Sequence, residues 1–260
     1  MELPIYQIDA FAERRFAGNP AAVVPLQAWL PDATLQAIAA ENNLSETAYF
    51  VREGDGFHLR WFTPTVEVEL CGHATLASGF VISTYLEPGR TRMSFRSVSG
   101  TLGVERRGDL YALDFPARPP KQVAMPDGIE RALGARPAAM LAAEYWLAVF
   151  ESEEEVAAVT PDAAAILALG RDGVIATAPG RSSDYVCRYF APHAGIPEDP
   201  ATGSAQCICV PYWAERLGKT RLTARQISRR VGSFECELKG ERVDIAGRCA
   251  LYLEGRIHVD

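Results

Sequence analysis

The sequence has no long apolar run and no motif that would direct it to a membrane or out of the cell. No stretch of 18 apolar residues occurs, and the start, MELPIYQIDA, lacks the basic and apolar regions of a signal peptide. The formal charge is -7, and the basic run RQISRR at 225–230 is short, so no surface for nucleic acid or anionic lipid is expected. We therefore expect a cytoplasmic protein with neither a nucleic-acid nor a membrane partner.

Cysteine pairs with metal-binding spacing are also missing. The six cysteines form no CxxC pair, and the four histidines are too widely spread to complete a zinc site. In a reducing compartment, such cysteines are expected to be small buried side chains. We predict neither a disulfide nor a metal for Cys71, Cys187, Cys207, Cys209, Cys236 and Cys249.

The chain does contain enough apolar sequence for a sizeable core. Of its 260 residues, 48% are hydrophobic and 23% are charged, and Pro and Gly are scattered, so disorder is not indicated. The length exceeds one average domain and favours two. The best linker candidate, PARPPKQVAMP at 116–126, divides the chain into 1–116 and 117–260. The last residues of the chain, about ten of them, are candidates to pack with the first half.

Three short patterns recur in the two halves. They occur in the same order and with nearly equal spacing, which indicates an internal duplication. The matched pairs are RWFTP at 60–64 with RYFAP at 188–192, GHA at 72–74 with GSA at 203–205, and GTLGVE from Gly100 with GSFECE from Gly232.

Each half follows the same predicted order of elements. A β-rich run ends at a proline, which cannot donate to a sheet, and an irregular loop follows. A long apolar segment then predicts a central helix, at 74–86 in the first half and at 205–217 in the second, beginning at the Gly-x-Ala pattern. In the second helix, Pro211 predicts a kink or a late start. Short strands complete each half, and further helices are predicted at 32–42 and 161–169.

This pattern favours an α+β architecture with two pseudo-symmetric domains, each a mostly antiparallel curved sheet around one central helix. If the halves pack about a pseudo-twofold axis, the loops before the two helices face each other across a cleft, where ligand sites are common. Helix N-termini supply N–H donors there, and Gly72 and Gly203 let the backbone approach a ligand closely. We therefore expect a small carboxylated substrate.

Longer motifs give the sequence a resemblance to a known family. They are IDAFAERRFAGNPAAVV near the start, NLSETAYF around Glu46, RWFTPTVEVELCGHAT at 60–75 and FAPHAGIPEDPATGSA at 190–205. The sequence resembles the PhzF-like (phenazine biosynthesis-like) family of isomerases, which share the diaminopimelate epimerase fold. The resemblance covers nearly the whole chain. It implies two domains, usually a homodimer, an active site between the domains, and no metal or other cofactor.

One departure from the family pattern lies in the second half. The family commonly has Gln-Gly where this chain has Gln226 followed by Ile227. The resemblance therefore does not extend to that part of the substrate pocket.

The resemblance also assigns roles to individual residues. It places a catalytic glutamate at Glu46, and further catalytic side chains at His73, Asp199 and Ser204. The implied chemistry is proton abstraction from one carbon and return to another, a double-bond shift like that of trans-2,3-dihydro-3-hydroxyanthranilate isomerase. A glutamate can serve as base and then as acid when its environment brings its pKa toward neutrality. Asn19, in AGNPAA, is a weaker candidate for a substrate contact.

Each candidate also has an ordinary structural explanation. Ser204 after a glycine would serve as a helix N-cap, and Asp199 before a proline is a common turn former. A single histidine such as His73 is more often hydrogen-bonded structure than a catalyst. Glu198, beside Asp199, is given no catalytic role.

Two other functions remain open at this stage. A two-thiol racemase or epimerase shares this fold but needs a cysteine on each face of its substrate. Cys71 fits one such position, whereas Thr202 occupies the other, which argues against this function. A non-catalytic binding protein would gain nothing from a carboxylate at Glu46, because it would repel a carboxylated ligand.

Overall fold

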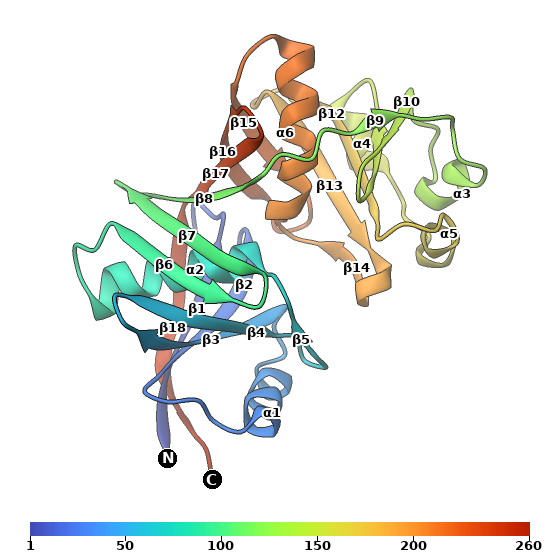
Figure 1. The fold of residues 1–260 in the computed structure, drawn as a ribbon. Helices are drawn as coiled ribbons and strands as arrows, with labels where there is room; N and C mark the ends of the chain where they lie inside the picture. The colour runs from blue at the N-terminus through green and yellow to red at the C-terminus, as the bar shows by residue number, and fades with distance from the viewer. The chain divides into compact units, whose positions relative to one another are not determined.

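The computed structural model describes residues 1–260, which divide into two compact units (Figure 1). The first unit comprises Met1–Asp114 together with Ala246–Asp260, and the second comprises Phe115–Ile245. The boundary predicted from the sequence lies between residues 116 and 117. None of the helices is both long enough and apolar enough to cross a membrane.

The first unit is built on one mostly antiparallel sheet. Its strands are β1 (Glu2–Ala10), β2 (Asn19–Leu26), β3 (Glu46–Glu53), β4 (Gly56–Phe62), β5 (Glu67–Val68), β6 (Arg92–Ser97), β7 (Gly100–Arg107), β8 (Leu110–Pro116) and β18 (Cys249–His258). The pairing order is β18-β1-β2-β3-β4-β6-β7-β8, with β5 on β4. β2 pairs parallel with β3, and β4 pairs parallel with β6. Alternate residues of β6 are buried, as expected for a sheet with one face on a core.

The central helix of the first unit is α2 (Gly72–Val81), which continues into a π-helical turn at Ile82–Leu86. The sequence predicts this helix at 74–86, and the structure begins it two residues earlier, at the glycine itself. Most of α2 is buried. Gly79 is required by packing, because a Cβ at this position would lie 2.6 Å from Cγ1 of Val104 in β7.

The predicted helix at 32–42 is confirmed as α1 (Asp32–Asn42), directly after Pro31. It buries Leu35 in a cluster with Tyr49 and Phe62. The Tyr49 hydroxyl also donates a 2.8 Å hydrogen bond to the carbonyl of Leu35, which ties α1 to β3.

The second unit repeats this plan. Its strands are β9 (Lys121–Gln122), β10 (Ala139–Ala142), β11 (Trp146–Val149), β12 (Val174–Pro179), β13 (Tyr185–Ala191), β14 (Ile196–Asp199), β15 (Arg221–Gln226), β16 (Gly232–Lys239) and β17 (Arg242–Gly247), the last of which ends in the first unit. From β11 the pairing runs parallel to β12, antiparallel to β13, parallel to β15 and antiparallel to β16. The run β2-β3-β4-β6-β7 of the first unit has the same sequence of directions.

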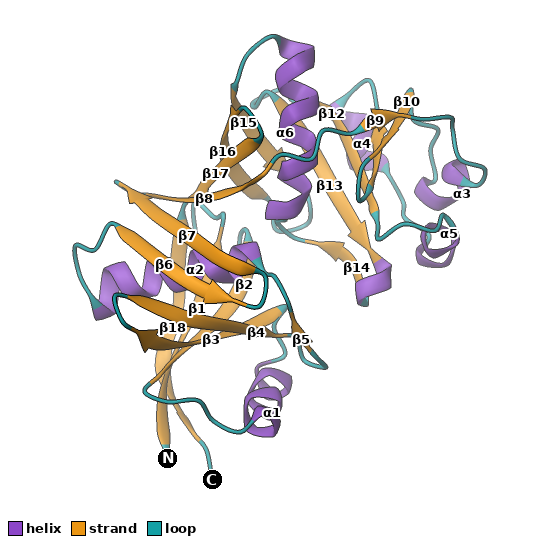
Figure 2. Cartoon of the chain, in the orientation of Figure 1, coloured by secondary structure: helices purple, strands orange, loops and turns teal.

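The central helix of the second unit is α6 (Gly203–Leu217), and Figure 2 shows α2 and α6 each among the strands of its own unit. The late start that Pro211 predicts is wrong, because the helix is continuous from Gly203. A proline has no N–H to donate to the carbonyl four residues earlier, which here belongs to Cys207. The backbone N–H of Arg118 donates to that carbonyl instead, at 2.9 Å. A neighbouring segment therefore satisfies the group that the proline leaves unbonded.

Short helices complete the second unit. They are α3 (Ile129–Leu133), α4 (Glu153–Ala158), α5 (Ala163–Ala168) and the 3₁₀ turn η2 (Pro192–Ala194). α5 falls within the helix predicted at 161–169 and is shorter, because Asp162 is its N-cap and accepts from the N–H of Ala165. All six cysteines are free thiols; five are buried, and Cys249 is partly exposed.

Corresponding ion pairs hold the loop before each central helix. Arg60 donates two hydrogen bonds to the carboxylate of Glu67, both at 2.7 Å, and Arg188 donates two to Glu198, at 2.7 and 2.8 Å. Each guanidinium also lies over the ring of the phenylalanine two residues later, at 5.1 and 4.9 Å. Glu198, to which the sequence analysis gives no catalytic role, thus forms the ion pair with Arg188 in the second unit.

Candidate active site

In the first unit, three predicted or suspected functional residues lie together. Glu46 is the first residue of β3, Cys71 is the N-cap of α2, and His73 is in the first turn of α2. Nε2 of His73 is 3.1 Å from Oε2 of Glu46, and Nδ1 of the same ring is 3.4 Å from the sulfur of Cys71. The side chains of His73 and Glu46 are 8% and 13% exposed, so the group is largely shielded from water.

The contact between Glu46 and His73 has the distance of an ion pair but not the alignment of a hydrogen bond. Oε2 of Glu46 and Nε2 of His73 are both buried, and neither has a hydrogen-bond partner. Leaving a buried polar atom without a partner costs about 1–3 kcal/mol. The site therefore holds an acceptor and a ring nitrogen that can each form a bond to a third group.

The ionisation of Cys71 and His73 follows from their burial and from each other. Burial, with the nearby carboxylate of Glu46 as a second cause, raises the pKa of the Cys71 thiol to about 11, so the group is a neutral thiol at neutral pH. Burial lowers the pKa of His73, but the effects of Cys71 and Glu46 together outweigh it and raise that pKa well above 6.5. Because a neutral thiol carries no charge, Cys71 and His73 do not form an ion pair at neutral pH.

The same three side chains offer donor atoms within 4.8 Å of one another, which raises the question of a metal. His73 meets Cys71 through Nδ1 and Glu46 through Nε2, and these nitrogens point to different sides of the ring. An ion bound by one nitrogen would therefore have only one of the other two donors on its side. The arrangement is a chain from thiol through imidazole to carboxylate, which does not fit the convergent ligand set of a zinc site.

Asn19 and Gly72 lie beside this group. Asn19 is fully buried at the start of β2, and its Oδ1 accepts a 3.3 Å hydrogen bond from Ser45, the residue before Glu46. In the parallel pairing of β2 with β3, Ala21 lies opposite Glu46. Asn19 thus contacts the segment that carries the glutamate, and Gly72 is the first residue of α2.

In the second unit, Asp199, Gly203 and Ser204 lie around the start of α6. Asp199 ends β14, and its Oδ2 accepts a short hydrogen bond from the hydroxyl of Thr202. Ser204 accepts a 3.2 Å hydrogen bond from the hydroxyl of Tyr145. The ordinary explanation of Ser204 as a helix N-cap is wrong, because Thr202 is the N-cap and Ser204 is inside the helix.

Gly203 is not required by the protein around it. Its φ is not in the left-handed region, and a Cβ added there would meet no protein atom within 4 Å. The glycine therefore leaves open space at the first turn of a helix, where backbone N–H groups lack intrahelical partners.

Some residues around these groups escaped the sequence reasoning. Tyr145 lies in the turn between β10 and β11, outside every recognised motif, and its contact with Ser204 spans 59 residues of sequence. Gln226 was noted only for the residue that follows it. Its side chain is fully buried and hydrogen-bonds the loop between Asp199 and Thr202.

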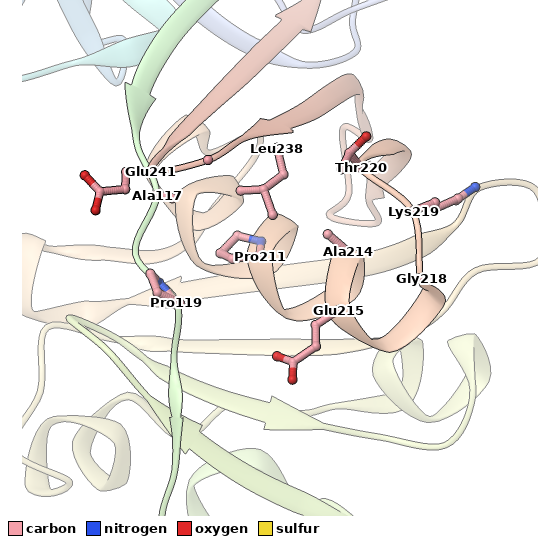
Figure 3. Close-up of a pocket in the computed structure, with 11 residues that line it drawn as sticks. Ala117, Pro119, Pro211, Ala214, Glu215, Gly218, Lys219, Thr220, Leu238 and Glu241 are labelled. Carbon is pink, nitrogen blue, oxygen red and sulfur yellow. The ribbon is translucent and has the colours of Figure 1, made fainter.

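A cavity of about 600 Å³ lies elsewhere, on the second unit beside the C-terminal half of α6 (Figure 3). Pro211, Ala214 and Leu238 line it, with charged side chains such as Glu215 at its edge. None of the predicted site residues lines this cavity. Convergent polar groups, which orient a substrate in an active site, are found at the two helix starts instead.

Comparison with known proteins identifies the relatives of this chain. Residues 8–255 match the family model described as phenazine biosynthesis-like protein. An uncharacterized isomerase of Pseudomonas aeruginosa is 52% identical over 260 residues, which cover 100% of both chains.

Solved structures agree with this match. A PhzF-family phenazine biosynthesis protein of Enterococcus faecalis has a TM-score of 0.98 and 46% identity, with 100% of both chains covered. A hydroxyproline epimerase of Agrobacterium vitis, covering 98% of this chain and 92% of its own, has a TM-score of 0.62 at 10% identity and so shares the fold alone. The chain therefore belongs to the phenazine biosynthesis-like family and has the diaminopimelate epimerase-like fold.

Proposed function

We propose that this protein is an isomerase that uses no metal or coenzyme and moves a proton between two carbons of a small carboxylated substrate. Its family and its similarity to a protein named as an isomerase support the class of reaction. The observation that carries the mechanism is the pairing of Glu46 with His73, in which a buried carboxylate oxygen and a buried ring nitrogen both lack a hydrogen-bond partner.

Glu46 serves as the base and then as the acid. Its carboxylate takes a proton from one substrate carbon, and the electron pair of the broken C–H bond forms a new double bond. The former double bond supplies the pair that takes a proton from the Glu46 carboxylic acid at a second carbon. Atoms and electrons balance without an oxidant or reductant, so no redox cofactor is needed. Because the site is shielded from water, the proton stays with Glu46 between the two steps.

His73 stabilises the charged form of Glu46. Since the pKa of His73 is raised, its ring holds a proton near neutral pH and faces the carboxylate with Nε2. The positive charge of the protonated ring attracts the Glu46 carboxylate before proton abstraction. The ring N–H can also donate a hydrogen bond to a substrate oxygen that gains negative charge during the double-bond shift. Removing the proton from His73 would therefore weaken both effects.

In the second unit, Asp199 and Ser204 keep their predicted roles as contacts for polar groups of the substrate, and Gly203 keeps its role in close backbone approach. The open space at Gly203 supports this proposal, as do the N–H groups of the first turn of α6, which have no partner within the helix, because both suit a carboxylate. We also propose a homodimer, on the family resemblance, which sedimentation velocity would test against a 28.3 kDa monomer.

The proposed reaction is tested by proton NMR of trans-2,3-dihydro-3-hydroxyanthranilate in D₂O with wild type and Glu46→Gln. Isomerisation by the wild type, lost in Glu46→Gln, is the expected result, and little deuterium should enter the product because Glu46 keeps the abstracted proton. Glu46→Gln preserves shape and removes the base, and circular dichroism checks that it folds. If the wild type isomerises and Glu46→Gln does so equally fast, Glu46 is not the base. If neither reacts, this substrate is excluded and other small carboxylated compounds become the next tests.

A further inference from the structure

The side chain of Gln226, a residue to which the family resemblance assigns no role, makes three hydrogen bonds. It is the last residue of β15, and its side chain is fully buried. Oε1 accepts from the N–H of Thr202 at 2.8 Å, and Nε2 donates to the carbonyl of Asp199 at 2.6 Å and to Oγ1 of Thr202 at 3.0 Å. All three bonds go to the loop that joins β14 to α6.

The direction of these bonds is determined by the chemistry of the groups. An amide nitrogen can only donate, so Oγ1 of Thr202 accepts from Gln226 and gives its own proton to Oδ2 of Asp199. Thr202 is the N-cap of α6, but its hydroxyl makes no capping bond to the helix. The hydroxyl of Thr202 therefore bonds the carboxylate of Asp199 and does not form the capping bond that is usual for a threonine at this position.

The rest of the loop is held by the segment that follows Gln226. The hydroxyl of Ser228 donates to the carbonyl of Pro200 at 2.7 Å. A Cβ at Gly232 would lie 2.5 Å from the Cβ of Ala201, so only glycine allows this contact. The next residue back, Val231, has a φ of 58°, which is strained for a β-branched side chain. These contacts press the turn between β15 and β16 against the loop that carries Asp199.

We propose that Gln226 is a positioning residue that holds the Asp199 carboxylate and the first turn of α6 in the geometry for reaction. The proposal rests on the proposed function, because Asp199 is taken there as a contact for the substrate. Gln226 does not touch the reacting atoms and acts through Thr202 and the loop backbone. The amide of Gln226 donates to the hydroxyl of Thr202, and that hydroxyl donates to the carboxylate of Asp199. The amide of Gln226 does not titrate, so it remains a donor at every pH.

The test compares Gln226→Met, which keeps the volume of the side chain and removes its hydrogen bonds, with Thr177→Val as a matched control. Thr177 is also fully buried in the second unit, and its hydroxyl bonds Trp213 and Val186, away from this loop. A displacement of a reacting group by about 1 Å can cost about 10²-fold in rate. We expect Gln226→Met to lower kcat by about 10²-fold and Thr177→Val to leave it within about twofold.

Two measurements on the folded proteins do not depend on turnover. Amide hydrogen exchange at Thr202 should be at least about tenfold faster in Gln226→Met, because Oε1 of Gln226 accepts that N–H. The carboxyl carbon-13 signal of Asp199, assigned with Asp199→Asn, should titrate at a higher pH in Gln226→Met than in wild type, because the Thr202 hydroxyl that donates to this carboxylate is no longer held by Gln226. Thr177→Val should show neither change.

The outcomes separate this proposal from the proposed function. Unchanged Asp199 titration in Gln226→Met, or an equal loss of kcat in Thr177→Val, would mean that Gln226 contributes stability only, and the proposal would be wrong. If the wild type isomerises nothing, the proposed function fails, whereas the exchange and titration results still decide the role of Gln226. If Gln226→Met does not fold, Thr202→Val breaks the same path at its middle, and Thr202→Ser should restore the titration.

Discussion

The two units share a scaffold but differ in the side chains at the start of the central helix. In the first unit, the residue before the helix is Cys71, whose sulfur contacts His73, and His73 faces Glu46. In the second, the equivalent residue is Thr202, whose hydroxyl donates to Asp199. The first arrangement can move a proton, because it pairs a buried carboxylate with an imidazole of raised pKa. In the second arrangement, the hydroxyl of Thr202 fixes the position of the Asp199 carboxylate.

What the units have in common is the support beneath these side chains. In both, an arginine on one strand makes a bidentate pair with a glutamate on the short strand that follows, Glu67 in β5 or Glu198 in β14. Each arginine also holds a helix of its own unit: Arg60 donates to Asp32 in α1, and Arg188 donates to carbonyls at the end of α4, including that of Val156. The difference between the units is therefore confined to a few side chains on matching frames.

The sharpest way to break the comparison is to neutralise one carboxylate in each unit. Glu46→Gln should lower kcat by about 10²–10⁴-fold, because the proposed general base is lost. Asp199→Asn keeps the loop and should lower kcat less and raise KM more, since Asp199 is proposed to bind the substrate. Steady-state kinetics on the same substrate decides this. A larger kcat loss in Asp199→Asn would assign the proton transfer to the second unit.

The arginine–glutamate ion pair should contribute more to the free energy of unfolding in the second unit, at Arg188, than in the first, at Arg60. The side chains of Arg188 and Glu198 are 12% and 22% exposed, whereas those of Asp32 and Glu67, the partners of Arg60, are 77% and 35% exposed. We expect Arg188→Met to lower the free energy of unfolding by about 2–4 kcal/mol and Arg60→Met by about 1 kcal/mol, because exposed pairs are screened. Urea denaturation measures both, and equal losses would contradict the difference in burial.

Substitutions of the glycines in the two central helices should change the free energy of unfolding by an intermediate amount. Gly79→Ala would place a Cβ against Val104 and should cost about 1–3 kcal/mol of stability, because the helix packs too closely on β7. Gly203→Ala has open space and should stay within about 1 kcal/mol of wild type. If Gly203→Ala instead raised KM with an unchanged melting temperature, a substrate approaching that backbone would explain the glycine.

The smallest effect is expected from alkylation of Cys71 at neutral pH. Since burial raises the pKa of this thiol to about 11, little thiolate is present at pH 7, and iodoacetamide should react slowly and leave most activity. The rate should rise about tenfold per pH unit toward pH 11, as measured by mass spectrometry of the peptide that contains Cys71. Unfolded protein, with ordinary thiols, is the control. Rapid modification of Cys71 with loss of activity at pH 7 would instead support the function of a two-thiol racemase.

Local patterns predicted the elements of the fold well where a few adjacent residues decide them. The helix predicted at 32–42 appears as α1, and the short strands predicted to complete each half appear as β7, β8, β16 and β17. The late start expected at Pro211 failed, because the group that satisfies the Cys207 carbonyl is Arg118, far away in the sequence. A residue-by-residue preference contains no information on such a partner.

The candidate site divides in the same way. The motifs, through the family that they resemble, singled out Glu46, His73, Asp199 and Ser204, and the duplicated patterns indicated two related halves. The tertiary structure decided that Cys71 joins His73, that Tyr145 contacts Ser204, and that Gln226 holds the loop of Asp199. Sequence determines the periodicity and turn chemistry of each segment because these depend on near neighbours. Hydrogen bonds between distant segments depend on how the sheet brings its strands together, which only the folded chain establishes.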